Sequence, residues 1–122
     1  MKRILVVDDS LALRGSLRAL LAAEFPDAIV GEAAAALPAL ALVAEEGWDL
    51  VLLDLSLPDR GGVETLRDLR KLRPNLPVVV MSLHGEAEYR AAMCAAGAVD
   101  YISKGGSSQA IAASIRTALG SG

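Results

Sequence analysis

The stretch that decides the fold runs from Asp49 to Pro58 and reads DLVLLDLSLP. Residues 50–53 are apolar on both of the faces that a strand would present, which is typical of a strand buried on both sides in a parallel sheet. Asp54 comes where this strand should end. Ligands of open α/β sheets bind outside the carboxyl ends of the strands, and burying a lone carboxylate there is costly. Asp54 is therefore the first candidate for a functional residue.

The composition indicates one globular domain, which we place at residues 1–122. Hydrophobic residues make up 53% of the 122, so the chain can bury a core. The net charge of −3 gives no electrostatic basis for nucleic-acid binding by this chain itself. The single Cys94 excludes an internal disulfide and fits a reducing compartment. Because the chain shows neither a signal-peptide pattern nor the roughly 18 apolar residues of a membrane helix, we expect a cytoplasmic protein without a membrane segment.

Five short segments have the pattern of strands, and helix patterns separate them. The predicted strands are residues 4–7, 28–33, 50–54, 77–82 and 99–103. Strands and helices therefore alternate five times, which predicts a doubly wound α/β fold, a five-stranded parallel sheet with helices on both faces. The first, third and fourth strands are the most apolar and the second is weaker. We therefore expect the order 2-1-3-4-5, with the second strand at an edge.

Five segments have start or stop residues of helices, and all but the fourth also show apolar side chains at helical spacing. The first helix begins after Asp9 or Ser10, the second covers residues 34–46 with Pro38 in its first turn, and the third begins after Gly62. The fourth covers residues 86–96 before Gly97, and the fifth begins after Ser107 or Ser108. The side chains expected to face the sheet are Leu13, Leu17, Leu20, Leu21, Ala39, Leu40, Val43, Val63, Leu66, Leu69, Leu72, Ile111, Ile115 and Leu119.

Polar side chains follow or end four of the five predicted strands. Asp8 and Asp9 come after the first, Asp54 ends the third, Ser82 ends the fourth and Lys104 follows the fifth. In the order 2-1-3-4-5 these strand ends are neighbours, so the fold gathers three carboxylates, a hydroxyl and an ammonium in one cleft. Carboxylates this close repel one another, and a divalent cation removes the repulsion. An all-oxygen site that keeps several waters suits Mg²⁺.

These groups are the ones that phosphoryl transfer needs, namely a nucleophile, cations that neutralise charge and a hydrogen-bond donor. With Mg²⁺ and Lys104 to neutralise charge, Asp54 is interpreted as a nucleophile that accepts a phosphoryl group, and Ser82 would donate a hydrogen bond to one of its oxygens. Each residue alone has a simpler explanation: Asp8 and Asp9 as a helix cap, Asp54 as a turn residue, Lys104 as a solvated surface lysine. Their joint placement at four strand ends of one sheet favours the site.

Four short motifs match a known family: VVDD at residues 6–9, LLDLSLP at 52–58 with Gly62, VMS at 80–82 and YISK at 101–104. With them the chain resembles a two-component response regulator receiver domain over essentially its whole length. The resemblance implies a phosphorylation-dependent signalling switch with the flavodoxin-like fold, and it supports the order 2-1-3-4-5. It also implies a cytoplasmic phosphoprotein that is not an enzyme, apart from catalysing its own phosphorylation and dephosphorylation.

The resemblance assigns roles to the candidate residues. Asp54 would take a phosphoryl group from a sensor histidine kinase. Asp9, Asp54 and the backbone carbonyl of Ser56 would bind Mg²⁺, with Asp8 helping mostly through water. Ser82 and Lys104 would hold the phosphoryl oxygens.

Tyr101 falls where the family has an aromatic residue that moves inward when the serine or threonine is recruited. The simpler alternative is a half-buried aromatic on an edge strand. Phosphorylation would change the surface formed by residues 86–103 and the last helix. That face, or the first and last helices, is a candidate homodimer surface.

The output is left open by the sequence. Residues 30–33 and 101–105 resemble the subfamily with a C-terminal helix-turn-helix DNA-binding domain, which would regulate transcription, but the chain contains no such domain. A stand-alone receiver acting through protein–protein contacts is the alternative. The chain could also be a dimerisation module, or a small phosphatase with an aspartyl-phosphate intermediate. Such phosphatases often place a second acid two residues after the nucleophile, where this chain has Ser56.

Three residues depart from or add to the family pattern. Leu83 is bulkier than the small residue common after Ser82, and we expect it to narrow access to Asp54. His84 lies where it could influence hydrolysis, although a solvated loop histidine is the simpler explanation. Gly105 replaces a proline that many members have after the lysine, which argues against a cis peptide there, because a cis bond before a non-proline residue costs roughly 2.5–4 kcal/mol.

Overall fold

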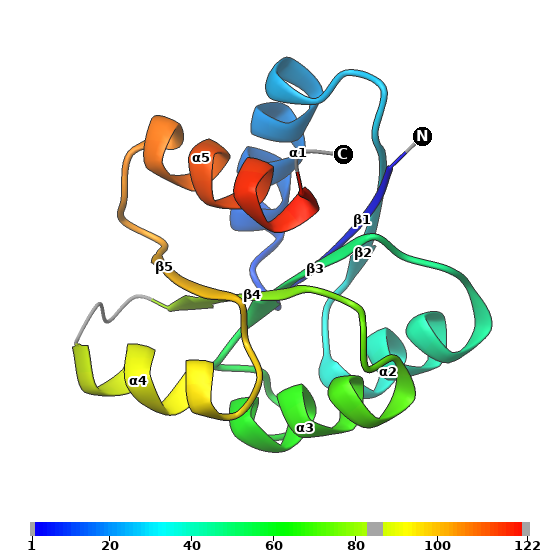
Figure 1. Ribbon diagram of the computed structural model, residues 1–122. Helices are drawn as coiled ribbons and strands as arrows, with labels where there is room; N and C mark the ends of the chain where they lie inside the picture. The colour runs from blue at the N-terminus through cyan, green and yellow to red at the C-terminus, as the bar shows by residue number, and fades with distance from the viewer. Residues whose placement is uncertain (1, 83–86, 121–122) are drawn as a thin grey trace.

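In the computed structural model, which describes residues 2–82 and 87–120, five strands form one parallel sheet (Figure 1). The strands are β1 (Arg3–Val7), β2 (Ile29–Ala33), β3 (Leu50–Asp54), β4 (Val78–Ser82) and β5 (Asp100–Ser103). Their order is β2-β1-β3-β4-β5, which confirms the predicted 2-1-3-4-5 arrangement with the second strand at an edge.

Five helices in the described part of the chain cover the two faces of the sheet. They are α1 (Leu11–Glu24), α2 (Ala36–Glu45), α3 (Gly62–Leu72), α4 (Ala87–Ala95) and α5 (Ser108–Leu119). Figure 1 shows α1 and α5 on one side of the sheet and α2, α3 and α4 on the other. The doubly wound α/β prediction is therefore confirmed. None of these helices is both long and apolar enough to cross a membrane.

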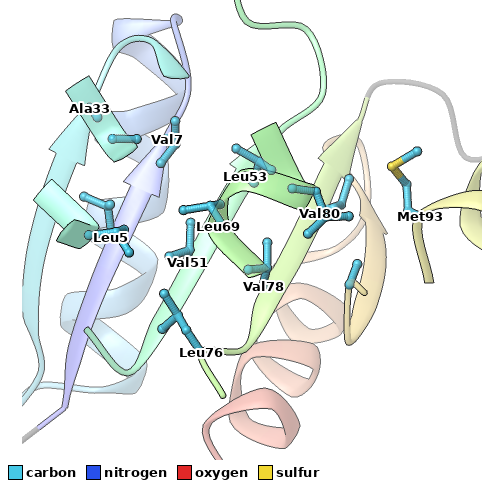
Figure 2. Close-up of a cluster of buried hydrophobic side chains, with 14 of the residues drawn as sticks. Leu5, Val7, Ala33, Val51, Leu53, Leu69, Leu76, Val78, Val80 and Met93 are labelled. Carbon is cyan, nitrogen blue, oxygen red and sulfur yellow. The ribbon is translucent and has the colours of Figure 1, made fainter. Parts of the chain in front are cut away.

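The sheet divides the core into two layers because successive side chains of a strand point to opposite faces. In β3, Val51 and Leu53 pack toward α2, α3 and α4, while Leu50 and Leu52 pack toward α1 and α5. Figure 2 shows residues of the first layer, which includes side chains from β1, β3 and β4 together with Leu69 of α3 and Met93 of α4. Residues 50–54 are all buried, so the strand has no solvent-exposed face. This explains the apolar run in the sequence.

The caps and stops agree with the sequence signals in most places. Ser10, rather than Asp9, caps α1, since its Oγ accepts a hydrogen bond from Leu13 N at 3.2 Å. Ser107 caps α5 in the same way. Gly97 follows α4 with φ at 113°, in the left-handed region that favours glycine after a helix.

The structure corrects two of the predictions and agrees with a third. Leu72, whose spacing predicts that it faces the sheet, is 38% exposed, because it is the last residue of α3, where the chain leaves the core. The second helix begins two residues later than predicted, at Ala36. All peptide bonds between described residues are trans, including the one before Gly105. The expectations for Leu83 and His84, and the start of the fourth helix at residue 86, lie outside the described residues.

One glycine fixes how α3 meets the end of β3. Gly62, the first residue of α3, is buried, and a Cβ on it would lie 2.5 Å from Leu55 Cδ2 and 3.1 Å from the Leu55 backbone. Since Leu55 follows Asp54 directly, this close approach helps to set the path of the chain just after the site. A side chain at residue 62 would force that path to shift.

We expect Gly62→Ala to lower the free energy of unfolding by about 1–3 kcal/mol, because the added methyl overpacks against backbone that cannot move away. Urea unfolding followed by circular dichroism measures the change. Gly15→Ala is the matched control, because a Cβ at residue 15 would meet nothing within 4 Å and α1 should gain about 0.5–1 kcal/mol. Equal effects of the two substitutions would contradict this interpretation.

Candidate functional site

The carboxyl ends of β1, β3 and β5 bring two acids and a lysine into contact. Asp8 follows β1, Asp54 ends β3 and Lys104 follows β5. Val7 of β1 pairs with Leu53 of β3. The residues that follow this pair along the chain, Asp8 and Asp54, therefore lie side by side. Lys104 Nζ lies 2.8 Å from Asp8 Oδ2 and 2.9 Å from Asp54 Oδ1. The structure therefore gathers these groups as the strand order predicted.

Asp9 completes an acidic cluster with Asp8 and Asp54. One carboxylate oxygen from each of the three residues lies within 4.8 Å of the other two. Asp8 and Asp54 are buried, at 0% and 1% exposure, whereas Asp9 is exposed. The cluster is thus anchored in the sheet and open to solvent on the Asp9 side. Its oxygens could hold a metal ion.

The hydrogen bonds of the buried acids are incomplete. Asp8 Oδ1 accepts from Ser10 N at 2.8 Å, and Asp54 Oδ1 accepts from Ser56 N at 3.1 Å. Among the described residues, Asp54 Oδ2 has no hydrogen-bond donor, and Asp8 Oδ2 has only the ion pair with Lys104. A buried carboxylate oxygen without a partner is costly. Because hard divalent cations take oxygen ligands, the donor set fits Mg²⁺.

Lys104 compensates only part of the negative charge. Burial lowers the pKa of its ammonium, but the contacts of that ammonium with the carboxylates of Asp8 and Asp54 outweigh the burial, and the pKa lies above its usual value. The group is therefore charged at neutral pH. One ammonium faces three carboxylates, so the cluster stays negative and attracts a cation.

Ser82 lies at the same rim of the sheet. It ends β4, is 6% exposed, and its backbone carbonyl accepts from Lys104 N at 2.8 Å. Leu55 N donates to Met81 O at 3.2 Å, which ties the chain after Asp54 to the residue before Ser82. The structure thus places Ser82 next to both Asp54 and Lys104 along the sheet edge. Its contact with a phosphoryl oxygen stays a prediction.

The structure gives the burial of Tyr101 and the backbone contact of Ser56, but it does not test the roles predicted for them. Tyr101 is 2% exposed and belongs to the core layer that contains Val80 and Met93, so the half-buried alternative is wrong. Its role as a switch stays a prediction. Ser56 is exposed, and its amide is the group that contacts Asp54. The use of its carbonyl as a metal ligand also stays a prediction.

Sequence reasoning missed two side chains that brace the turns around the site. Arg14 Nη1 donates to Asp8 O at 2.5 Å, while Arg14 Nε pairs with Glu32 Oε1 at 3.0 Å. Asp59 accepts hydrogen bonds from two backbone amides at the start of α2. The sequence does hint at the second contact. The cap residue of α2 is Ala35, which has no side-chain acceptor, so the first amides of this helix need an acceptor from another segment.

Comparisons with known proteins agree with this geometry. Residues 4–116 match the model of the response regulator receiver domain family. The KDP operon transcriptional regulatory protein KdpE of Escherichia coli K12 is 39% identical over 119 residues, which are 98% of this chain and 52% of that protein. A protein-glutamate methylesterase/protein-glutamine glutaminase of Agrobacterium fabrum is 38% identical over 103 residues, which are 84% of this chain and 29% of that protein.

A solved structure shares both fold and length. The crystal structure of a CheY-like response regulator receiver domain protein from Methanospirillum hungatei JF-1 superposes with a TM-score of 0.88 at 34% identity. The match covers 98% of this chain and 94% of that one. By contrast, the chain spans about half or less of the two curated relatives named above.

We expect Lys104→Met to lower the free energy of unfolding by about 1–3 kcal/mol at pH 7 in the absence of divalent cations, since it leaves adjacent buried carboxylates uncompensated in a cleft partly screened by solvent. Because the pKa of Lys104 is raised on folding, its contribution is full below the ordinary lysine pKa and disappears as the pH rises through the folded pKa. The gap between wild type and variant should therefore close at high alkaline pH.

Urea unfolding in a chelator across neutral to alkaline pH measures both effects. The control is Lys71→Met, which removes an exposed lysine of α3 and should change stability by no more than about 0.5 kcal/mol. A gap that stays constant to the highest pH would show that the ammonium charge is not what stabilises the cluster.

Proposed function

The chain belongs to the response regulator receiver domain family, and from this we propose that it is a switch that accepts a phosphoryl group on Asp54 from a sensor histidine kinase. The observation that carries the proposal is the contact of Lys104 with Asp8 and Asp54 within a cluster that also contains Asp9. Family membership supports phosphorylation-dependent signalling. The specific roles of these residues are the proposal.

In the proposed reaction, a carboxylate oxygen of Asp54 attacks the phosphorus of a phosphohistidine on the kinase. A P–O bond forms and the P–N bond breaks, and the imidazole keeps the electron pair and takes up a proton. The ammonium of Lys104 would neutralise charge on the transferring group, and its contact with Asp54 Oδ1 supports this role. Asp8, Asp9, Asp54 and the Ser56 carbonyl would hold Mg²⁺, which supplies further charge neutralisation as a Lewis acid.

Signalling then follows from a shift between two conformations. The hydroxyl of Ser82 would donate to a phosphoryl oxygen, which biases the state in which Tyr101 lies inward. Ser82 and Tyr101 lie on paired strands, since Ser82 is in register with Ser103 of β5 and Val80 with Tyr101. A change at Ser82 can therefore reach the surface of α4, β5 and α5.

The output we propose is control of transcription through a DNA-binding domain outside residues 1–122. The name of the KdpE relative, a transcriptional regulatory protein, supports it. The name of the second relative, a protein-glutamate methylesterase/protein-glutamine glutaminase, gives a different activity for that protein. The alternative for this chain is a stand-alone receiver that acts through protein–protein contacts. We further propose that the protein is cytoplasmic and acts as a homodimer through α1 and α5 or through the face of α4, β5 and α5.

A phosphatase function is less well supported by the site. The residue two positions after Asp54 is Ser56, which cannot serve as the general acid that such enzymes often have there. The proposed chemistry is therefore limited to phosphorylation and dephosphorylation of the protein itself.

We expect Asp54→Asn to abolish phosphoryl incorporation from a small donor such as acetyl phosphate with Mg²⁺, while the fold stays intact, because the amide lacks the nucleophilic oxygen. Intact-mass spectrometry measures incorporation, and circular dichroism checks the fold. Asp68→Asn, which alters an acid on α3 that pairs with Arg60, is the control and should be phosphorylated normally. Incorporation by Asp54→Asn at the wild-type level would remove Asp54 from its role.

Mg²⁺ should stabilise the wild-type protein by about 1.4 kcal/mol at ten times its dissociation constant. Asp9→Asn should weaken Mg²⁺ binding about ten-fold or more, because it removes an anionic ligand at the open side of the cluster. Calorimetric titration and chemical unfolding with and without Mg²⁺ measure the two effects. If Asp9→Asn binds Mg²⁺ as tightly as wild type, the metal does not lie in this cluster.

A further inference from the structure

The loop between β3 and α3, residues 55–61, carries the chain away from Asp54, and it is fastened to a helix that is distant in sequence. The fastening group is the carboxylate of Asp59. Its Oδ1 accepts from Ala36 N at 2.8 Å and its Oδ2 accepts from Leu37 N at 2.9 Å. Both donors belong to the first turn of α2, more than twenty residues earlier in the chain.

The two hydrogen bonds complete the start of α2. Its cap residue is Ala35, which has no side-chain acceptor, and the first turn contains no acid. Pro38 has no amide hydrogen, and Ala39 N bonds to Ala35 O. The amides of Ala36 and Leu37 therefore need an acceptor from elsewhere, and Asp59 satisfies both of them.

The charge of Asp59 strengthens the attachment. The hydrogen bond from Leu37 and then the one from Ala36 hold the pKa of this carboxyl below its usual value, so it is ionised at neutral pH. An anion at a helix N-terminus also interacts favourably with the helix dipole. Asp59 thus makes a charge-assisted, bidentate contact with a helix end.

The helix at the other end of this contact is firmly held. Ala36, Ala39 and Val43 of α2 are completely buried against the sheet. In the loop, Ser56 is exposed, and its amide donates a hydrogen bond to Asp54 Oδ1. Gly62 fixes the far end of the loop against Leu55. Asp59 therefore attaches the loop to α2 at a position between Ser56 and Gly62.

We infer that Asp59 is a positioning residue for the metal and phosphorylation site. By tying the loop to α2, it holds the backbone of Ser56 over the acidic cluster, with the Ser56 amide on Asp54 and the carbonyl available as an oxygen ligand for Mg²⁺. The inference rests on the proposed function, because it assigns Asp59 a part in assembling that site. It does not place Asp59 in contact with the metal or the phosphoryl group.

Asp59→Ala tests the inference against a matched variant, Val43→Ala. Val43→Ala destabilises α2 through lost packing but leaves the Asp59 contact in place. Three quantities are measured for both: the Mg²⁺ dissociation constant by calorimetry, the rate of Asp54 phosphorylation by acetyl phosphate, and the hydrogen exchange rates of the Leu37 and Ser56 amides by NMR. Asp59→Asn, which can accept at one position only, serves as a milder second variant should Asp59→Ala not fold.

In Asp59→Ala we expect Mg²⁺ affinity to fall about ten-fold, as is typical when a residue that orients a metal ligand is lost, and phosphorylation to slow in parallel. The Leu37 and Ser56 amides should both exchange faster, whereas Val43→Ala should leave Mg²⁺ affinity and the Ser56 amide unchanged. Equal Mg²⁺ affinities in Asp59→Ala and Val43→Ala, or an unchanged Ser56 amide, would overturn the inference. Failure of the wild-type protein to bind Mg²⁺ would instead refute the proposed function.

Discussion

The ion pairs of Lys104 with Asp8 and Asp54 are the interaction on which the rest of the site depends. Two carboxylates buried side by side repel each other, and the ammonium between them reduces that repulsion. It does not remove it, because Asp9 adds a third carboxylate and Asp54 Oδ2 is buried without a hydrogen-bond donor among the described residues. The site is thus tolerated by the fold while it keeps a demand for positive charge, which is what a metal-dependent phosphoryl acceptor requires.

The sheet makes this arrangement rigid. Strands β1, β3 and β4 are covered on both faces, by α1 and α5 on one side and α2, α3 and α4 on the other (Figure 1). The register of β1 and β3 puts Asp8 beside Asp54, and the hydrogen bond from Lys104 N to Ser82 O ties the ends of β4 and β5. At this edge, Arg14 donates a hydrogen bond to Asp8 O after β1, and Asp59 of the loop after β3 accepts one from Ala36 N at the start of α2.

The sequence predicted the strands and helices from local periodicity and the candidate residues from their position at strand ends, whereas the strand order also drew on the resemblance to a known family. One prediction of burial was wrong, because the apolar pattern does not show where a helix leaves the core. Leu72 has the right spacing for the inner face of α3, yet the helix ends there and leaves it exposed. For Tyr101 the sequence left the extent of burial open, and the structure buries this side chain of an edge strand in the core layer with Met93 of α4.

Local pattern thus determined the alternation of strands and helices and the position of Asp8, Asp9, Asp54, Ser82 and Lys104 at or beside the ends of predicted strands, since apolar runs and helix stripes are properties of contiguous residues. The strand order that brings those ends to one rim drew also on the resemblance to a known family. The tertiary structure decided which atoms touch. The two contacts of Lys104 and the hold of Asp59 on α2 depend on distances between segments far apart in the chain. Those distances arise only when helices and strands pack together, so they cannot be predicted from the residues adjacent in the sequence.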